Sequence, residues 1–297
     1  MTPQQISQLL TTIYGQILYC CFVKRRKIAL ENINRVYKST LSSTKKTQLA
    51  KAFFSHVALS IEETYLTHRG KKNKLPKLSI LGIEHLHEAR KLGKGVIVLW
   101  GHNGNFEFVI PTCIEMIGAA YNNTYVIRKQ QKPWLQKKLM RLYQKSGISI
   151  INKGSAVKVA KEILEKQGVL FVFFDYHAYL HKQQGIPVKF FGEKAGCARG
   201  LATLVKQTGV SLVPMNQYRI DPTQHILKFH PLTQWISVED DEQAIYKNTL
   251  QYNQILEQFI LENPHQWWCW VHRRWKLDLS DPQQPKDRIK IMTNRAC

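Results

Sequence analysis

A histidine and a glutamate that could act together in catalysis follow a short apolar run. His102 and Glu107 lie in the segment GHNGNFE, directly after the run VIVLW at residues 96–100. This run is rich in β-branched residues, which is typical of a strand buried on both faces of a sheet. A histidine that leaves such a strand at its carboxyl end lies where α/β folds bind their ligands. His102 is therefore the first candidate for a catalytic base.

The spacing of the pair restricts how the two side chains can meet. On one continuous helix, five residues at about 100° each would place them about 140° apart. They meet only if His102 lies in a turn before the helix that carries Glu107, and Gly104 favours such a turn. The carboxylate would then bind one ring nitrogen and leave the other as a general base for a hydroxyl. An isolated match to this spacing more often marks helix-capping residues, so that alternative stays open here.

Further apolar runs place this pair in an α/β fold. GVLFVFF at residues 168–174 and VSLVPM at residues 210–215 indicate two more buried strands. Residues 134–146 and 155–167, which lie between the strands, have helical patterns. Strands that alternate with helices predict an α/β sandwich.

A helical lead-in precedes the predicted sheet. Residues 44–66 carry apolar residues at steps of three and four, which predicts an amphipathic helix. The stripe consists of Ala50, Phe54, Val57, Ile61 and Tyr65. We expect residues 1–66 to form a membrane-associating helical segment and residues 78–280 to form a single α/β domain.

The first helix of this lead-in has two possible environments. The N-terminus lacks the features of a secretory signal, and no stretch reaches the ~18 to 20 apolar residues that span a bilayer. The nearest is IYGQILYCCFV at residues 13–23, which is followed directly by the cations of residues 24–27. Such a helix could lie in the headgroup region of an anionic leaflet. A buried helix with a solvated basic end explains the same residues equally well.

The charge of the chain restricts its partners. It has 297 residues, with 43 Lys and Arg against 21 Asp and Glu, so its formal net charge is +22. The excess favours nucleic acid, anionic lipid, a phosphorylated small molecule or an acidic carrier protein as the partner. The six cysteines have no zinc-ligand spacing and indicate reduced thiols in a cytoplasmic environment.

The segment around His102 resembles a known enzyme block. GKGVIVLWGHNGNFE is similar to the H-x-x-x-x-D/E block of the glycerolipid and lipid A acyltransferases. Its H-x-G-N-aromatic-E form resembles the lipid A late (lauroyl/myristoyl) acyltransferase branch, which usually has Trp where this chain has Phe106. Further blocks agree in order and spacing, and they extend the resemblance from about Arg25 to Lys276: KIALENINRVY, LGIE, YVIRKQQKP, GVLFVFFDYH with GIPVKFFG, and PHQWWCWVHRRWK.

This resemblance implies a mixed-sheet α/β sandwich of the glycerol-phosphate acyltransferase type, at the cytoplasmic face of a bacterial inner membrane. It implies transfer of a fatty acyl chain from acyl carrier protein, or from acyl-CoA, to a hydroxyl of a lipid A precursor. His102 would be the general base, and Glu107 would orient and charge it. No metal or organic cofactor is expected because the thioester is already activated, and no G-x-S-x-G elbow offers a covalent nucleophile.

Two alternatives to this activity stay open. The same chemistry could act on a lysophospholipid or on another glycolipid. A non-catalytic protein that binds anionic membranes or nucleic acid would also suit the net charge. The block around His102 and the lack of a nucleic-acid-binding motif favour the enzyme, so we expect lipid and carrier partners and no nucleic acid.

Several polar residues are candidates for substrate binding. The resemblance makes Arg128 the counterpart of the family's arginine, and at the end of a predicted strand it could hold a phosphate or the developing oxyanion. Asn105 lies within the catalytic block, while Arg273 and Arg274 could hold a phosphate. We interpret Asp175 as a carboxylate at the sheet edge that lines the site or pairs with a basic residue.

Three further patterns have a functional and a structural interpretation. Lys137, Lys138, Arg141 and Lys145 share one helical face, which could bind lipid phosphates or an acidic carrier, or could simply be solvated. The tryptophans among residues 267–275 suit a membrane-interface belt or core packing equally well. Asp175, His177 and His181 lack a metal-site motif, so we predict no metal there.

Overall fold

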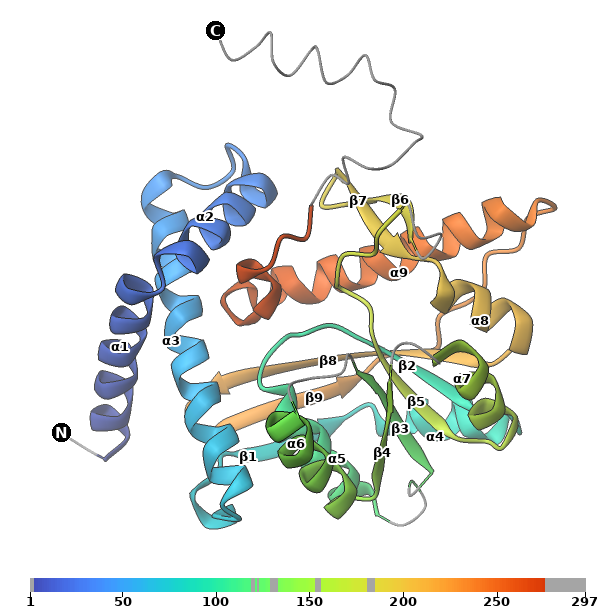
Figure 1. Cartoon of the computed structure of the whole chain (residues 1–297), viewed down its shortest axis with the longest axis horizontal. Helices are drawn as coiled ribbons and strands as arrows, with labels where there is room; N and C mark the ends of the chain where they lie inside the picture. Colours follow the sequence, from blue (N-terminus) through green and yellow to red (C-terminus); the bar gives the residue numbers. More distant parts are fainter. Residues whose placement is uncertain are drawn as a thin grey trace, which may run out of the picture.

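The computed structural model describes residues 3–118, 121, 123–128, 133–152, 156–180 and 185–275. A seven-stranded sheet forms its centre, in the order β1-β9-β8-β2-β5-β3-β4 (Figure 1). Among the strands of this sheet that the structure describes, only β8 and β9 pair in antiparallel fashion, so the predicted mixed α/β sheet is confirmed. The strands are β1 (Lys77–Leu81), β2 (Val96–Trp100), β3 (Thr124–Arg128), β4 (Ile148–Asn152), β5 (Val169–Phe173), β8 (Ser211–Asp221) and β9 (Gln224–Phe229). A separate antiparallel hairpin joins β6 (Gly185–Phe190) to β7 (Glu193–Ala198).

Helices cover both faces of the sheet. One face packs against α4 (Ile83–Lys91), α5 (Phe106–Ile117) and α6 (Pro133–Lys145). The other packs against α7 (Ala156–Glu165), α8 (Gly200–Thr208) and α9 (Asp241–Glu262). The helices predicted at residues 134–146 and 155–167 correspond to α6 and α7, and both are confirmed.

Strand β2 shows why the sheet needs cover on both sides. Ile97 and Leu99 belong to the core cluster beside α7, α8 and α9, while Val96, Val98 and Trp100 belong to the cluster on the opposite face. All five residues are buried, because successive side chains of a strand point to opposite faces. The prediction that VIVLW forms a strand buried on both faces is confirmed.

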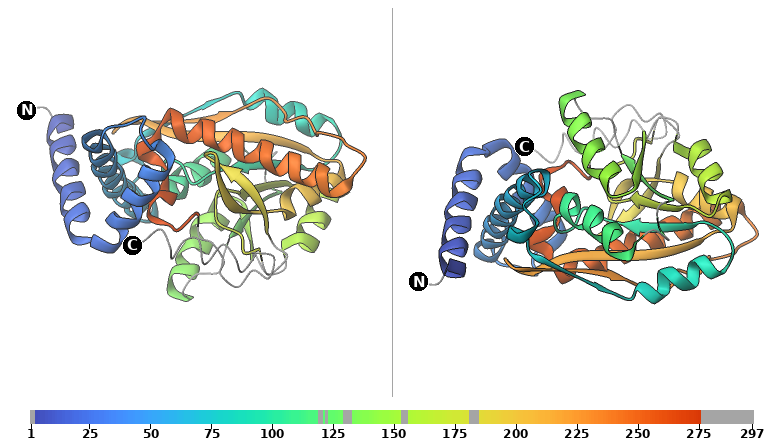
Figure 2. Two further views of the ribbon diagram at one scale, coloured as in Figure 1. Left: turned by 90° about the horizontal axis from the view of Figure 1, so that it is seen from above. Right: turned by 90° about the horizontal axis from the view of Figure 1, so that it is seen from below.

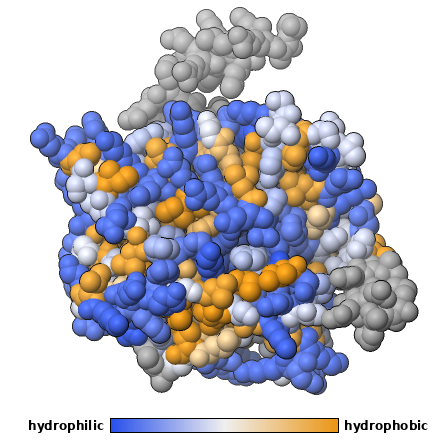
Figure 3. All heavy atoms as spheres, turned by 180° about the vertical axis from the view of Figure 1, so that it is seen from behind, coloured by the Kyte–Doolittle hydropathy of each residue, from blue (hydrophilic) through white to orange (hydrophobic). Residues whose placement is uncertain are grey.

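The N-terminal helices are α1 (Pro3–Cys21), α2 (Val23–Tyr37) and α3 (Ser43–His68). Figure 2 shows them together at one end of the molecule, with α1 outermost and α3 nearest the sheet. None of the described helices is long and apolar enough to cross a membrane. Figure 3 shows the face opposite to that of Figure 1, where hydrophilic side chains predominate around scattered apolar patches.

Helix α3 confirms the predicted amphipathic helix but not all of its buried stripe. Ala50 and Phe54 are buried as expected, whereas Ile61 and Tyr65 are 55% and 61% exposed. The second half of α3 instead buries polar residues, namely His56, Ser60 and Glu63. The apolar periodicity failed there because the partner surface on β8 and β9 is itself charged and polar.

Glu63 is the centre of a buried polar network between α3 and the sheet. Its carboxylate accepts hydrogen bonds from both terminal nitrogens of Arg219 on β8, from His225 on β9 and from the amide of Asn105. Burial opposes the charge of Glu63, but hydrogen bonds from His225 and Arg219 lower its pKa to about 2. The network fixes α3 to the sheet through three separate segments of the chain.

We predict that Glu63→Ala lowers the free energy of unfolding by about 3–5 kcal/mol at neutral pH, because it leaves Arg219 as an unpaired buried charge. Urea denaturation followed by circular dichroism measures this loss. The neighbouring Glu62 is exposed, and Glu62→Ala should change stability by no more than about 0.5 kcal/mol.

The same network should depend on pH. The folded pKa of Glu63 lies below the ordinary value of 4.5, so its stabilising contribution is complete above that value and is lost as the pH falls towards about 2. The difference in stability between wild type and Glu63→Ala should shrink over this range, and a constant difference would contradict the assignment.

Candidate active site

His102 lies in the turn between β2 and α5, at the carboxyl edge of the sheet. Its ring nitrogen Nδ1 lies 2.6 Å from Oδ1 of Asp175, and its backbone N–H donates to Oδ2 of the same carboxylate at 2.8 Å. The His102 side chain is only 5% exposed, and that of Asp175 is fully buried. With Nδ1 bound to the carboxylate, the remaining ring nitrogen, Nε2, can serve as a base.

Neighbouring parallel strands bring this pair together. Asp175 follows β5, which pairs with β2 in parallel register from Val96↔Val169 to Trp100↔Phe173. Both strands therefore end at the same edge of the sheet, although His102 and Asp175 are 73 residues apart in sequence. The expectation that Asp175 lies at the sheet edge and pairs with a basic residue is met by His102.

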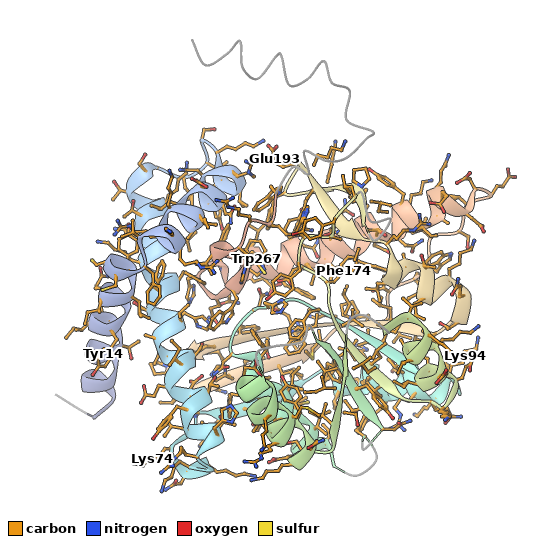
Figure 4. All side chains as sticks on the ribbon, in the orientation of Figure 1. Tyr14, Lys74, Lys94, Phe174, Glu193 and Trp267 are labelled. Atoms are coloured by element: carbon orange, nitrogen blue, oxygen red, sulfur yellow. The ribbon has the colours of Figure 1, made fainter. Side chains whose placement is uncertain are left out.

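The C-terminal segment completes the surroundings of the carboxylate. Trp267 Nε1 donates to Oδ2 of Asp175 at 2.7 Å, and the thiol of Cys269 lies 3.4 Å from the same oxygen. Figure 4 shows Trp267 in the interior, above the sheet. Burial by itself would raise the pKa of Asp175, but the charge of His102 and the hydrogen bonds from His102 and Trp267 hold this pKa well below its usual value. The carboxylate is therefore ionised throughout the physiological range.

Backbone hydrogen bonds hold the turn that carries His102. Trp268 N–H donates to the carbonyl of His102 at 2.9 Å, and Gly104 N–H donates to the carbonyl of Gln266 at 3.1 Å. Gly104 has φ +56°, and a Cβ there would lie only 3.3 Å from the carbonyl oxygen of Gln217. Glycine suits this position because it adopts a positive φ without strain and lets the turn approach β8 closely.

Aromatic rings surround the imidazole of His102. Phe173 stacks on His102 at a centroid distance of 3.8 Å, and Phe106 meets it edge-on at 5.1 Å. Tyr176 lies 4.2 Å away and is partly exposed. These rings fix the imidazole plane and exclude water from it, which strengthens its interaction with the carboxylate.

Glu107 occupies a different position from the one predicted. It lies in the first turn of α5, as expected, but the contact described for its carboxylate is with the hydroxyl of Tyr143 at 3.2 Å. The Nδ1 proton that Glu107 was expected to bind is held by Asp175 instead. The pairing was wrong because the bend after His102 directs the ring towards β5, while Glu107 faces α6.

Two of the predicted substrate-binding residues have structural roles. Asn105 is buried and donates to the carboxylate of Glu63 at 2.9 Å and to the carbonyl of Ser60 at 3.2 Å. Arg274 is also buried, and it donates to the carbonyl of Gly196 at 2.9 Å and lies over the ring of Phe190. Their side chains are committed to α3 and to the β6–β7 hairpin, which corrects the prediction that they contact substrate.

The other predicted residues are placed as follows. Arg128 ends β3, so its backbone lies at the same sheet edge as His102, while its side chain is outside the described part. Arg273 is exposed. Lys137, Arg141 and Lys145 are exposed on α6, whereas the side chain of Lys138 is outside the described residues, as is His181. Core packing rather than an interface belt accounts for the buried tryptophans of the C-terminal segment, which are Trp267, Trp270 and Trp275.

One group of side chains has atoms that could ligate a metal. His102, Asp175 and Cys269 offer such atoms within 4.8 Å of one another. The carboxylate of Asp175, however, already accepts hydrogen bonds from the backbone and ring of His102, from Trp267 and from Cys269. Its lone pairs are directed at these donors, so the cluster fits a hydrogen-bonded histidine–carboxylate pair better than a metal site.

The comparison with known families identifies the kind of protein that carries this site. The sequence matches the family described as bacterial lipid A biosynthesis acyltransferase over residues 1–277. The chain belongs to this family. As a lipid A biosynthesis acyltransferase, it is an acyl-transferring enzyme of lipid biosynthesis, and the resemblance inferred from the sequence blocks is confirmed.

This lipid A biosynthesis acyltransferase was also compared with solved structures and with curated protein sequences. The chain is similar to the crystal structure of the 1-acyl-sn-glycerophosphate (LPA) acyltransferase, PlsC, from Thermotoga maritima, with 15% sequence identity and a TM-score of 0.38. The similarity covers 86% of this chain and 97% of that chain. No curated protein sequence matches the chain.

We predict that Asp175→Asn lowers kcat of this acyltransferase by about 10³- to 10⁴-fold, because an amide favours the wrong tautomer of His102. Steady-state assays of acyl transfer, with circular dichroism to verify folding, measure the effect. Glu107→Gln is the matched control, and it should retain much more activity if Asp175 rather than Glu107 orients the ring. A larger loss in Glu107→Gln would reverse the assignment.

Proposed function

We propose that the protein transfers a fatty acyl chain from the thioester of acyl carrier protein to a hydroxyl of a lipid A precursor. The observation that carries this proposal is the buried hydrogen bond between Nδ1 of His102 and Asp175, at a sheet edge where α/β enzymes bind substrates. Membership of the lipid A biosynthesis acyltransferase family supports the acceptor class.

In the proposed reaction, Nε2 of His102 removes the proton of the acceptor hydroxyl while the hydroxyl oxygen bonds to the thioester carbonyl carbon. Asp175 stabilises the imidazolium that forms. The tetrahedral intermediate then collapses and the C–S bond breaks. The leaving thiolate takes the proton from the imidazolium, so the products are an ester and a free thiol, and the enzyme is regenerated.

Cations near the sheet edge would stabilise the negative charges of this reaction. Arg128 is the proposed partner of the oxyanion or of an acceptor phosphate, because β3 ends at the same edge as β2 and β5. The exposed cations Lys137, Arg141 and Lys145 on α6 are the proposed contact for an acidic carrier. The thioester is already activated, so the proposal needs no metal or organic cofactor.

We further propose that α1 attaches the enzyme to the cytoplasmic face of the inner membrane. Ile13, Tyr14 and Ile17 on α1 are about half exposed, and so are Phe22 and Val23 at its junction with α2. The basic residues 24–27 follow at once. An exposed apolar helix surface beside cations suits an anionic bilayer surface.

We predict that cells without this protein lose one secondary acyl chain from lipid A, and that wild type but not His102→Ala restores it. Mass spectrometry of lipid A and of total lipids measures both the loss and the length of the chain. If lipid A is unchanged but a phospholipid or glycolipid is altered, that lipid is the acceptor and the proposed acyl-transfer chemistry is retained. No lipid change in any class would contradict the enzymatic function.

A second prediction concerns the membrane. The double variant Ile13→Ser/Ile17→Ser should bind vesicles containing anionic lipid at least about tenfold more weakly, because each buried isoleucine contributes roughly 1.5–3 kcal/mol. Vesicle sedimentation measures this affinity. Leu92→Ser/Leu261→Ser removes two apolar residues outside α1 that are 64% and 49% exposed, against 45% and 50% for Ile13 and Ile17, and should bind as wild type does. Equal weakening in both variants would mean that α1 is not the attachment surface.

A further inference from the structure

Helix α2 is hydrogen-bonded to residues 270–272 of the C-terminal segment. Arg25 Nη1 donates to the carbonyl of Val271 at 2.9 Å. Asn32 lies on the same helix and is buried. Its side-chain amide donates to the carbonyls of Trp270 at 2.8 Å and His272 at 2.7 Å. These three bonds hold α2 alongside the short 3-10 helix η5 (Trp268–Val271) and the residue that follows it. The basic end of α2 is thereby part of the wall beside the active site.

His272 lies between this basic end and the catalytic histidine. Its ring meets Tyr176 edge-on at a centroid distance of 5.5 Å, and Tyr176 in turn lies 4.2 Å from His102. Burial, the charge of Arg25 and that of His102 all lower the pKa of His272. A neutral His272 has a ring N–H to donate, and it adds no positive charge that would repel an imidazolium at His102.

Arg25 differs from the other arginines of α2 in its partners. Arg26 donates to the carbonyl of Tyr19 and lies over the ring of that residue. Arg35 lies over Trp275 and pairs with Glu193. Among the residues that the structure describes, the partner of Arg25 is a carbonyl group and not a carboxylate, and its side chain is exposed. Most of its N–H donors and its full charge are therefore directed to solvent at the active-site wall.

The geometry points to Arg25 and His272 as a binding site for a phosphate monoester of the acceptor lipid, an inference that rests on the proposed acyl transfer. A guanidinium is the side chain best suited to phosphate, since it offers paired N–H donors and a permanent charge.

The position of the site favours the acceptor over the donor as the source of the phosphate. Helix α2 begins directly after the exposed apolar residues of α1. In the proposed membrane orientation, Arg25 therefore lies at the depth of the lipid headgroups. Two ring contacts separate His272 from His102. A phosphate at Arg25 and a hydroxyl at His102 would thus be two separate groups of one glycolipid.

The test compares Arg25→Gln with wild type on two acceptors, a glycolipid with its phosphate monoester and the same glycolipid after dephosphorylation. We expect the KM for the phosphorylated acceptor to rise about 10- to 100-fold in Arg25→Gln, with kcat within about twofold, because a charge-assisted hydrogen bond is lost. The KM for the dephosphorylated acceptor should not change between the two proteins. Arg25→Lys should restore part of the difference.

Lys27→Gln is the matched control. It removes one charge from the same turn, but two residues further along a helix the side chain lies on nearly the opposite face. Because Lys27 also belongs to the proposed membrane contact of residues 24–27, any change in its KM should be the same for both acceptors and small beside the change in Arg25→Gln. An equal rise in Lys27→Gln would assign the effect to membrane attraction and overturn the site, and so would an equal rise on both acceptors. If only the KM for the thioester donor rises in Arg25→Gln, Arg25 binds the donor and not the acceptor, and the inference is overturned as well.

Direct binding separates this inference from the proposed activity. The affinity of the phosphorylated glycolipid, measured in detergent micelles by the tryptophan fluorescence of the whole protein, should fall about tenfold or more in Arg25→Gln. Equal affinity in wild type and Arg25→Gln would reject the site even if the enzyme transfers acyl chains normally. Weaker binding without any acyl transfer by wild type would instead reject the proposed function and keep the phosphate site.

Discussion

The site depends on the hydrogen bonds that the fully buried carboxylate of Asp175 accepts. A buried charge needs several hydrogen-bond donors, and Asp175 takes them from the turn after β2 and from the C-terminal segment. The need to satisfy one anion therefore draws together residues from two distant parts of the chain. Orientation of the imidazole follows from the same bonds, so the burial of the carboxylate and the position of the His102 ring have one physical cause.

The sequence predicted those features that depend on local pattern. The buried strand β2, the turn at Gly104 and the candidate base His102 all follow from residues within a few positions of one another. Asp175 was expected at the sheet edge, either lining the site or pairing with a basic residue. The partner of His102 was assigned to Glu107 instead, since no sequence pattern gives the direction in which a side chain leaves a turn.

The remaining errors have one origin, which is polar packing between distant segments. Ile61 and Tyr65 follow the apolar period of α3 but are exposed, because Glu63 on the other side binds Arg219 and His225. Arg274 is of a residue type that often binds phosphate, yet its partner is a carbonyl of the β6–β7 hairpin, 78 residues away in sequence. Hydrophobic periodicity locates helices well, whereas buried ion pairs and hydrogen bonds are specified only by the tertiary fold.

The late position of the segment from Trp267 to His272 has a consequence for how the protein matures. This segment supplies donors to Asp175, the backbone clamp on His102 and the carbonyls that hold α2, so nothing upstream of it can complete the site. During synthesis the helices and the sheet emerge from the ribosome first. The nascent chain can thus collapse while His102 is still without its final support. Acyl-transfer competence is acquired only when nearly the whole described chain is available to fold.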